Sequence, residues 1–155
     1  MSIFVVHEHH ASHLHFDLRL ETEGVLKSFA LPKGPSLNPA EKRLAIMVED
    51  HPLSYSDFEG IIPEGNYGAG YVVIWDNGTY NTKKGTLEEG ILELEFNGRI
   101  LKGAFLLKRL KDSQKNWLFF KKKDAYANPE FKLTLALTET KKKELKERIP
   151  PCALE

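Results

Sequence analysis

The chain has 155 residues, of which 41% are hydrophobic and 28% charged, and its 22 basic side chains balance its 22 acidic ones. This length predicts one domain, residues 1–155, with a core large enough to fold without disulfides. The single cysteine, Cys152, excludes a disulfide framework within the chain and a cysteine-rich zinc module. The sequence shows neither a signal-peptide pattern nor the roughly 20 apolar residues of a membrane helix, so we expect a cytoplasmic protein without membrane contact.

Short segments with the two-residue alternation of strands follow one another along the chain. The sequence predicts strands at 4–7, 13–21, 25–31, 43–49, 71–76, 91–96, 103–110 and 117–122, separated by turn signals at 33–35, 65–70, 76–78 and 97–98. Such a series with little helix predicts a mainly β protein, a small closed or nearly closed barrel with short flanking helices. A C-terminal tail, 124–155, contains the predicted helix 139–148, whose many Lys and Glu residues favour a solvated or loosely docked position.

The predicted strand at 13–21 has an unusual polar face. Its side chains alternate between an apolar side, with Leu14, Phe16, Leu18 and Leu20, and a polar side, with His13, His15, Asp17, Arg19 and Glu21. A solvent face usually carries Lys, Glu, Thr and Ser, so this set indicates a catalytic or binding role. In a small barrel such a face can point inward and line a pocket.

The polar face offers ligands for one metal ion. His15 and Asp17, two residues apart, project to the same side, and His9 can add a third ligand from the preceding segment. Two imidazoles and one carboxylate suit Mn, Fe, Zn or Co and leave coordination positions open for water and substrate. The same residues can instead form an ordinary exposed face, and His7, His10 and His13 are alternatives to His9.

Several basic side chains are candidates for binding an anion. Arg19 shares a face with the possible ligands, where a guanidinium can bind a phosphate oxygen pair. Lys33, Arg43 and His51 are uninformative when taken singly. A metal ion with an arginine and a histidine in one pocket is a plausible constellation for phosphoryl transfer.

Positive charge is concentrated late in the chain, between residues 99 and 123. We call this segment, with its nine basic residues and the one acid Asp112, the basic stretch. Trp117, Phe119 and Phe120 lie within it. Two readings stay open: a surface hairpin kept soluble by lysines, or a ribbon that contacts phosphates.

Several motifs stand in one order along the chain: FVVHEH (4–9), LHFDLRLE (14–21), GVLKSFALPKGPS (24–36), VEDHPL (48–53), DFEGIIPEG (57–65), YG (67–68) and VVIWDNG (72–78). Together they resemble the 3′-phosphoesterase domain of bacterial DNA ligase D, the end-joining ligase, and its free-standing archaeal and bacterial relatives. The resemblance covers about residues 3–123. It implies a β-barrel with a manganese-dependent pocket, with Zn²⁺ or Co²⁺ as other possible ions.

The resemblance also implies an activity and roles for residues. The family trims 3′ ends of DNA or RNA, for example on a primer–template: a terminal ribonucleoside is removed first, then the 3′-phosphate, leaving a 3′-hydroxyl. Matching positions make His9, His15 and Asp17 metal ligands and make Arg19 and His51 contacts of the scissile phosphate, with His51 as either a clamp or a general acid. Supporting active-site positions match Lys33, Arg43, Glu49 and Tyr55. His7 stands where relatives often have Gln, and any partner ligase or polymerase would be a separate chain.

Two other functions compete with this one. A cupin-like metal enzyme would use the pair His13 and His15, with Glu21 and Gly24 after it, although the spacing to Glu21 is longer than usual. A catalytically silent DNA-end binding module would use the basic stretch instead. Turnover of a 3′-phosphate oligonucleotide with added manganese, against binding without turnover, separates these readings.

Overall fold

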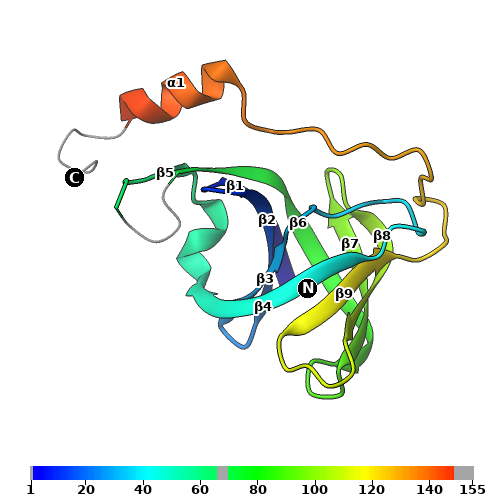
Figure 1. Ribbon diagram of the computed structural model, residues 1–155. Coiled ribbons are helices and arrows are strands. Elements are labelled where there is room, and N and C mark those ends of the chain that lie inside the picture. The colour runs from blue at the N-terminus through cyan, green and yellow to red at the C-terminus, as the bar shows by residue number, and fades with distance from the viewer. Residues whose placement is uncertain (1, 66–69, 149–155) are drawn as a thin grey trace.

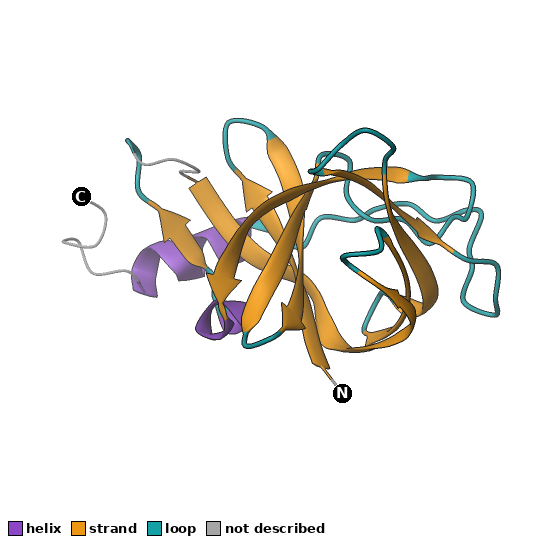
Figure 2. Cartoon of the chain, turned by 90° about the horizontal axis from the view of Figure 1, so that it is seen from below, coloured by secondary structure: helices purple, strands orange, loops and turns teal. Residues whose placement is uncertain are grey.

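One antiparallel sheet dominates the computed structural model, which describes residues 2–65 and 70–148. Its strands are β1 (Ser2–His10), β2 (Leu14–Thr22), β3 (Val25–Leu31), β4 (Arg43–Pro52), β5 (Gly60–Ile62), β6 (Gly70–Thr86), β7 (Ile91–Gly98), β8 (Lys102–Arg109) and β9 (Asn116–Lys121). The order β1-β2-β3-β4-β9-β8-β7-β6 is closed by pairing of β1 with β6, and β5 adds to β6 (Figures 1 and 2). The prediction of a closed, mainly β barrel is confirmed.

Alternation along each strand separates an apolar barrel interior from a polar exterior. Phe16, Leu18 and Leu20 of β2 point into a core formed with aromatic and aliphatic side chains from β1, β3, β4 and β6 to β9. Asp17 and Arg19, between them, therefore point to the outside of the barrel wall. The prediction that this polar face can line an interior pocket is wrong, because the interior is filled with hydrophobic side chains.

The predicted turn at 76–78 is also wrong, since β6 continues through it. The buried Asp76 carboxylate accepts hydrogen bonds from the backbone N–H groups of Asn77, Arg99, Ile100 and Leu101. A residue typical of turns thus stabilises the neighbouring connection between β7 and β8. Opposite it, the pairing of β1 with β6 shifts register between Val6 and His7.

Two segments lie outside the barrel wall. After β4 the chain forms the 3₁₀ helix η1 (Leu53–Asp57) and then β5 (Figure 1). Strand β5 pairs with the start of β6, which lies between β5 and β1. Residues 124–138 run from β9 to helix α1 (Glu139–Arg148), as predicted for the tail. The buried Glu8 carboxylate holds this segment through the backbone N–H groups of Ala136 and Leu137.

Helix α1 is docked more firmly than its composition suggests. Its Leu145 is fully buried, and the Lys141 ammonium lies 2.6 Å from the Glu59 carboxylate. No described helix has the length and apolar character needed to span a bilayer. The end of the predicted tail, 149–155, and most of the turn signal at 65–70 lie outside the described residues, and the single-domain assignment stays a prediction.

Candidate metal centre

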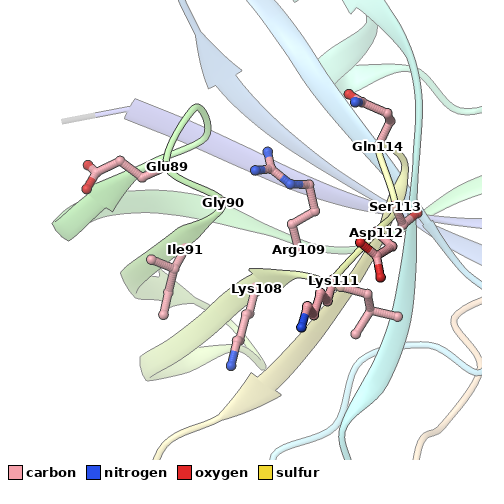
Figure 3. Close-up of a pocket in the computed structure, with 10 residues that line it drawn as sticks. Glu89, Gly90, Ile91, Lys108, Arg109, Lys111, Asp112, Ser113 and Gln114 are labelled. Carbon is pink, nitrogen blue, oxygen red and sulfur yellow. The ribbon is translucent and has the colours of Figure 1, made fainter.

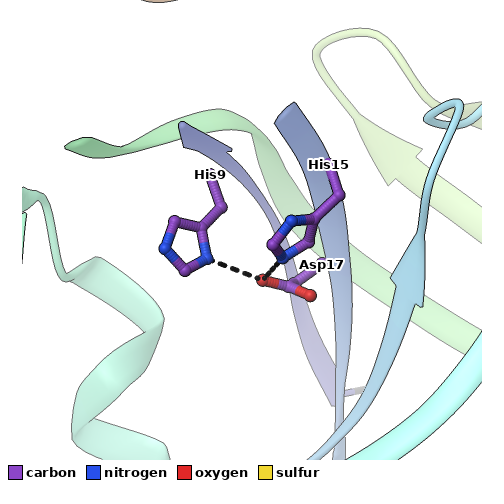
Figure 4. A group of neighbouring side chains, drawn as sticks. All are labelled: His9, His15 and Asp17. Carbon is purple, nitrogen blue, oxygen red and sulfur yellow. Dashed lines mark ion pairs between the residues drawn. The ribbon is translucent and has the colours of Figure 1, made fainter. Parts of the chain in front are cut away.

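Strand pairing brings three possible ligands together on the outer wall of the barrel. His9 of β1 is the register partner of His15 of β2, so both imidazoles lie on one face, and Asp17 follows two residues later on that face. Asp17 Oδ2 is 3.7 Å from His9 Nδ1 and 3.4 Å from His15 Nε2 (Figure 4). One ligand atom from each residue lies within 4.8 Å of the others.

The hydrogen bonds of this group suit a cation. The His13 carbonyl can only accept, so the Nδ1–H of His15 donates to it at 3.2 Å and Nε2 faces Asp17. Such a backbone partner is typical of metal-binding histidines. Burial alone would raise the pKa of Asp17, but hydrogen bonds from His15 and His9 and the charge of Arg19 outweigh it, and the pKa lies well below its ordinary value. An ionised carboxylate between two imidazoles fits a divalent ion such as manganese.

Arg19 lies directly beside this group and is 4% exposed. Its Nε donates to His7 Nδ1 at 2.9 Å, and its Nη1 donates to Ser28 Oγ at 2.9 Å and lies 3.1 Å from His51 Nδ1. Its Nη2 donates to Asp17 Oδ2 at 3.3 Å. Of the five N–H groups of a guanidinium, one on Nη2 is left for a ligand among the described contacts.

His51 and Tyr55 complete the cluster from the end of β4 and from η1. Their rings are 4.8 Å apart, and the Arg19 guanidinium carbon lies 5.0 Å from the centre of the Tyr55 ring. Burial and then the charge of Arg19 lower the pKa of His51, so its imidazole is neutral at pH 7. Burial raises the pKa of Tyr55, which therefore keeps its proton.

Among the described contacts, no side-chain hydrogen bond or ion pair joins three further candidates to this cluster. The Glu49 side chain is exposed, and only its carbonyl approaches the site, 3.2 Å from His51 Nδ1. Lys33 is exposed in the turn after β3. Arg43 begins β4 on the same face as the core residue Ala45, and its Nη2 lies 3.3 Å from Glu41. The supporting roles implied for these three positions stay predictions.

Two residues that hold Arg19 are not among the site residues predicted from the sequence. The sequence indicates His7 only as an alternative ligand or as a departure from relatives, and Ser28 is not predicted. The signal for Ser28 lies in the two-residue turn Glu23-Gly24, which pairs Thr22 with Val25 and therefore Arg19 with Ser28. For His7, burial and Arg19 lower the pKa to about 4, so its imidazole is neutral.

The basic stretch lies on the opposite wall of the barrel. Strand β8 is four strands from β2 in either direction around the ring. Trp117 and Phe119 point into the core, and Lys122 pairs with Glu93 at 2.6 Å. A cavity of about 740 Å³ between two hairpins is lined by Lys108, Arg109 and Lys111 but also by Glu89 and Asp112 (Figure 3). Two of the three aromatic rings of the stretch are therefore buried in the core, and part of its positive charge has acidic neighbours.

Comparison with known proteins identifies the family of this chain. The family described as the DNA ligase D 3′-phosphoesterase domain matches residues 7–109. The multifunctional non-homologous end joining protein LigD of Pseudomonas aeruginosa is 50% identical over 129 residues, which are 80% of this chain and 15% of that protein. The protein of the same name from Mycolicibacterium smegmatis is 44% identical over 146 residues, which are 88% of this chain and 19% of that protein.

A shorter match, 58% identical over 81 residues, joins 52% of the chain to 11% of LigD from Mycobacterium bovis. The chain thus spans less than a fifth of the length of these curated relatives. The family match covers more than half of the chain and includes the second half of β1, all of β2 and η1, and the cluster that they form. This chain belongs to the DNA ligase D 3′-phosphoesterase domain family.

Proposed function

We propose that this protein is a manganese-dependent phosphoesterase that processes the 3′ ends of DNA or of DNA ending in RNA. It removes a 3′-terminal ribonucleoside as a phosphodiesterase and then the 3′-phosphate as a phosphomonoesterase, leaving a hydroxyl for repair by a ligase or polymerase. The observation that carries this proposal is the shared oxygen at the site: Asp17 Oδ2 faces both imidazoles of the candidate ligands and also accepts from Arg19. The phosphate-binding cation thus adjoins the candidate metal ligands.

The candidate ligands and Arg19 have different roles in the proposed reaction. His9, His15 and Asp17 hold the ion, which when bound polarises a phosphate oxygen and increases the acidity of water. The remaining N–H of Arg19 binds another phosphate oxygen and offsets the charge that develops there. In each step water supplies the new oxygen on phosphorus. The bond from phosphorus to the 5′ oxygen of the terminal nucleoside breaks in the first step, and the bond to the 3′ oxygen of the strand breaks in the second, which releases inorganic phosphate.

His51 can serve this reaction in two protonation states. Arg19 Nη1 can only donate, so toward Arg19 the Nδ1 of His51 accepts and the imidazole is neutral. The Glu49 carbonyl, 3.2 Å from the same nitrogen, can only accept. If Nδ1 of His51 gains a proton next to a bound phosphate, it can no longer accept from Arg19 and donates to the Glu49 carbonyl instead. One N–H of Arg19 is then released for the phosphate. The Nε2–H of the protonated His51 can protonate the leaving oxygen.

A cupin-like enzyme is less favoured by the geometry. Its histidine pair would include His13, which is exposed, and among the described residues the clustered ligands are His9, His15 and Asp17.

The proposed function is tested with a primer–template whose strand ends in a ribonucleotide, incubated with manganese and, in parallel, with excess chelator. Release of the ribonucleoside and then of phosphate only with manganese supports the proposal. Binding without turnover at saturating manganese would leave the silent DNA-end binding module.

Acid is expected to weaken manganese binding, because protons compete with the ion for the imidazoles of the ligands. The Asp17 carboxylate, which accepts a hydrogen bond from the protonated imidazole, raises the pKa of His15 above its ordinary value of 6.5. Competition should therefore begin at a higher pH than for an ordinary histidine, and below that pH the dissociation constant should rise about tenfold per pH unit for each proton displaced. Calorimetry in buffers of different ionisation enthalpy counts these protons. A dissociation constant that stays the same between pH 5 and pH 7.5 would exclude imidazole ligands.

The salt dependence of DNA binding should show whether Lys33 or the basic stretch contacts phosphates. We expect Lys108→Ala, on the wall opposite the candidate metal centre, to leave the slope of log K against log salt unchanged for a primer–template. Lys33→Ala should reduce that slope by about 0.7–0.9 if Lys33 contacts one phosphate. Fluorescence anisotropy titrations across salt concentrations measure both slopes. A reduced slope for Lys108→Ala would instead show that the strand also contacts the basic stretch.

A further inference from the structure

The imidazole of His7 connects Arg19 to the segment that follows η1. His7 lies on β1 with no exposed surface. Its Nδ1 is 2.9 Å from Arg19 Nε, and its Nε2 is 3.0 Å from the Phe58 carbonyl oxygen. The edge of its ring contacts Tyr55, with ring centres 5.2 Å apart. The buried His7 side chain therefore contacts both Arg19 and the segment that follows η1.

The partners of His7 determine which nitrogen carries the proton. The Phe58 carbonyl can only accept, so Nε2 must donate to it, while the Nε of Arg19 can only donate, so Nδ1 must accept. Both ring nitrogens are thereby used. His7 is for this reason unsuited to be a fourth metal ligand, although it lies two residues before His9 on the same strand, and it is not part of the group of clustered ligand atoms.

We infer that His7 is a positioning residue that sets the orientation of the Arg19 guanidinium toward the substrate phosphate, an inference that rests on the proposed function. A planar guanidinium held by a single hydrogen bond can still rotate. Arg19 has a partner on each of its three nitrogens, with His7 on Nε, Ser28 on Nη1 and Asp17 on Nη2. His7 holds the nitrogen nearest the side-chain stem, so it sets the position from which the guanidinium plane extends. The free N–H on Nη2 then points in one direction. Displacement of such a group by about 1 Å can cost about 10²-fold in rate.

Two substitutions separate hydrogen bonding from packing. His7→Gln keeps an oxygen that can accept from Arg19 and an N–H that can donate to the Phe58 carbonyl. His7→Phe keeps a buried ring of similar shape and removes both hydrogen bonds. The positioning role predicts that His7→Phe loses about 10²-fold in kcat/KM on a 3′-phosphate oligonucleotide. His7→Gln should stay within about fivefold of the original protein, because the conservative variant restores both bonds.

Two binding measurements accompany the kinetics, and thermal unfolding confirms that each variant is folded. Manganese affinity, measured by calorimetry, should be the same in all three proteins, whereas the affinity of the manganese-loaded protein for inorganic phosphate should fall in His7→Phe and recover in His7→Gln. Unchanged kinetics and phosphate affinity in His7→Phe, or a loss of manganese affinity that parallels the loss of activity, would overturn the inference. If the original protein turns over no substrate, the proposed function fails, but phosphate affinity still tests the positioning of Arg19.

Discussion

Alanine in place of His9, His15 or Asp17 is expected to abolish metal-dependent turnover while leaving the barrel folded. The three side chains project from the outer wall, so removing one opens no cavity in the apolar core. Each variant loses one of three clustered ligands for the ion that polarises the phosphate, and we expect kcat/KM to fall on the order of 10³-fold. Manganese affinity should fall with it. Steady-state kinetics at several manganese concentrations and circular dichroism measure the two effects.

His13→Ala is the matched control for these ligand variants. His13 is an exposed imidazole beside β2, in sequence alternation with His15 and Asp17. Its described link to the site is its backbone carbonyl, which accepts from His15 and which alanine retains. His13→Ala should therefore keep both activity and manganese affinity. Full activity of chelator-treated protein, or equal losses for His13→Ala and His15→Ala, would contradict the assignment of the metal centre.

Loss of Arg19 should impair removal of the 3′-phosphate at least as much as removal of the terminal ribonucleoside. A phosphate monoester carries nearly one more negative charge than a diester at neutral pH, so it depends more on fixed positive charge. Arg19 is a buried guanidinium next to the candidate ligands, and we expect Arg19→Ala to reduce monoester hydrolysis on the order of 10³-fold. Because Arg19→Ala also removes a partner of Asp17, the assay needs saturating manganese.

A time course on a primer–template ending in a ribonucleotide tests this prediction, because it resolves the 3′-phosphate intermediate from the 3′-hydroxyl product. With the original protein the 3′-phosphate species should rise and then fall, and with Arg19→Ala it should accumulate. Arg19→Lys keeps the charge without the planar fork and should restore part of the monoesterase activity. Direct formation of the 3′-hydroxyl without the intermediate, even in Arg19→Ala, would rule out the sequential scheme.

The local features of this protein could be predicted from its sequence. The ranges of β3 and α1 match the predicted 25–31 and 139–148, since alternation and helical composition are properties of short segments. The position of His15 and Asp17 on one face of β2 could be predicted for the same reason, because residues two apart in any strand share a face. The resemblance to a family then selected His9 among the other histidines, and strand pairing places His9 next to His15 and Asp17. The assignment of these three residues as metal ligands stays a prediction.

What the sequence could not decide depends on contacts between distant segments. Alternation separates two faces but does not say which one is inside, and only closure of the barrel around an apolar core placed Asp17 on the outer wall. Three partners of Arg19, His7, Ser28 and His51, come from three other strands, so their meeting depends on the registers between strands. The turn residues at Asp76 lie within β6 because a buried carboxylate is stabilised there by backbone N–H groups more than 20 residues away. Long-range pairing and burial, which no short segment encodes, assigned His7 to Arg19 and separated the basic stretch from the candidate metal centre.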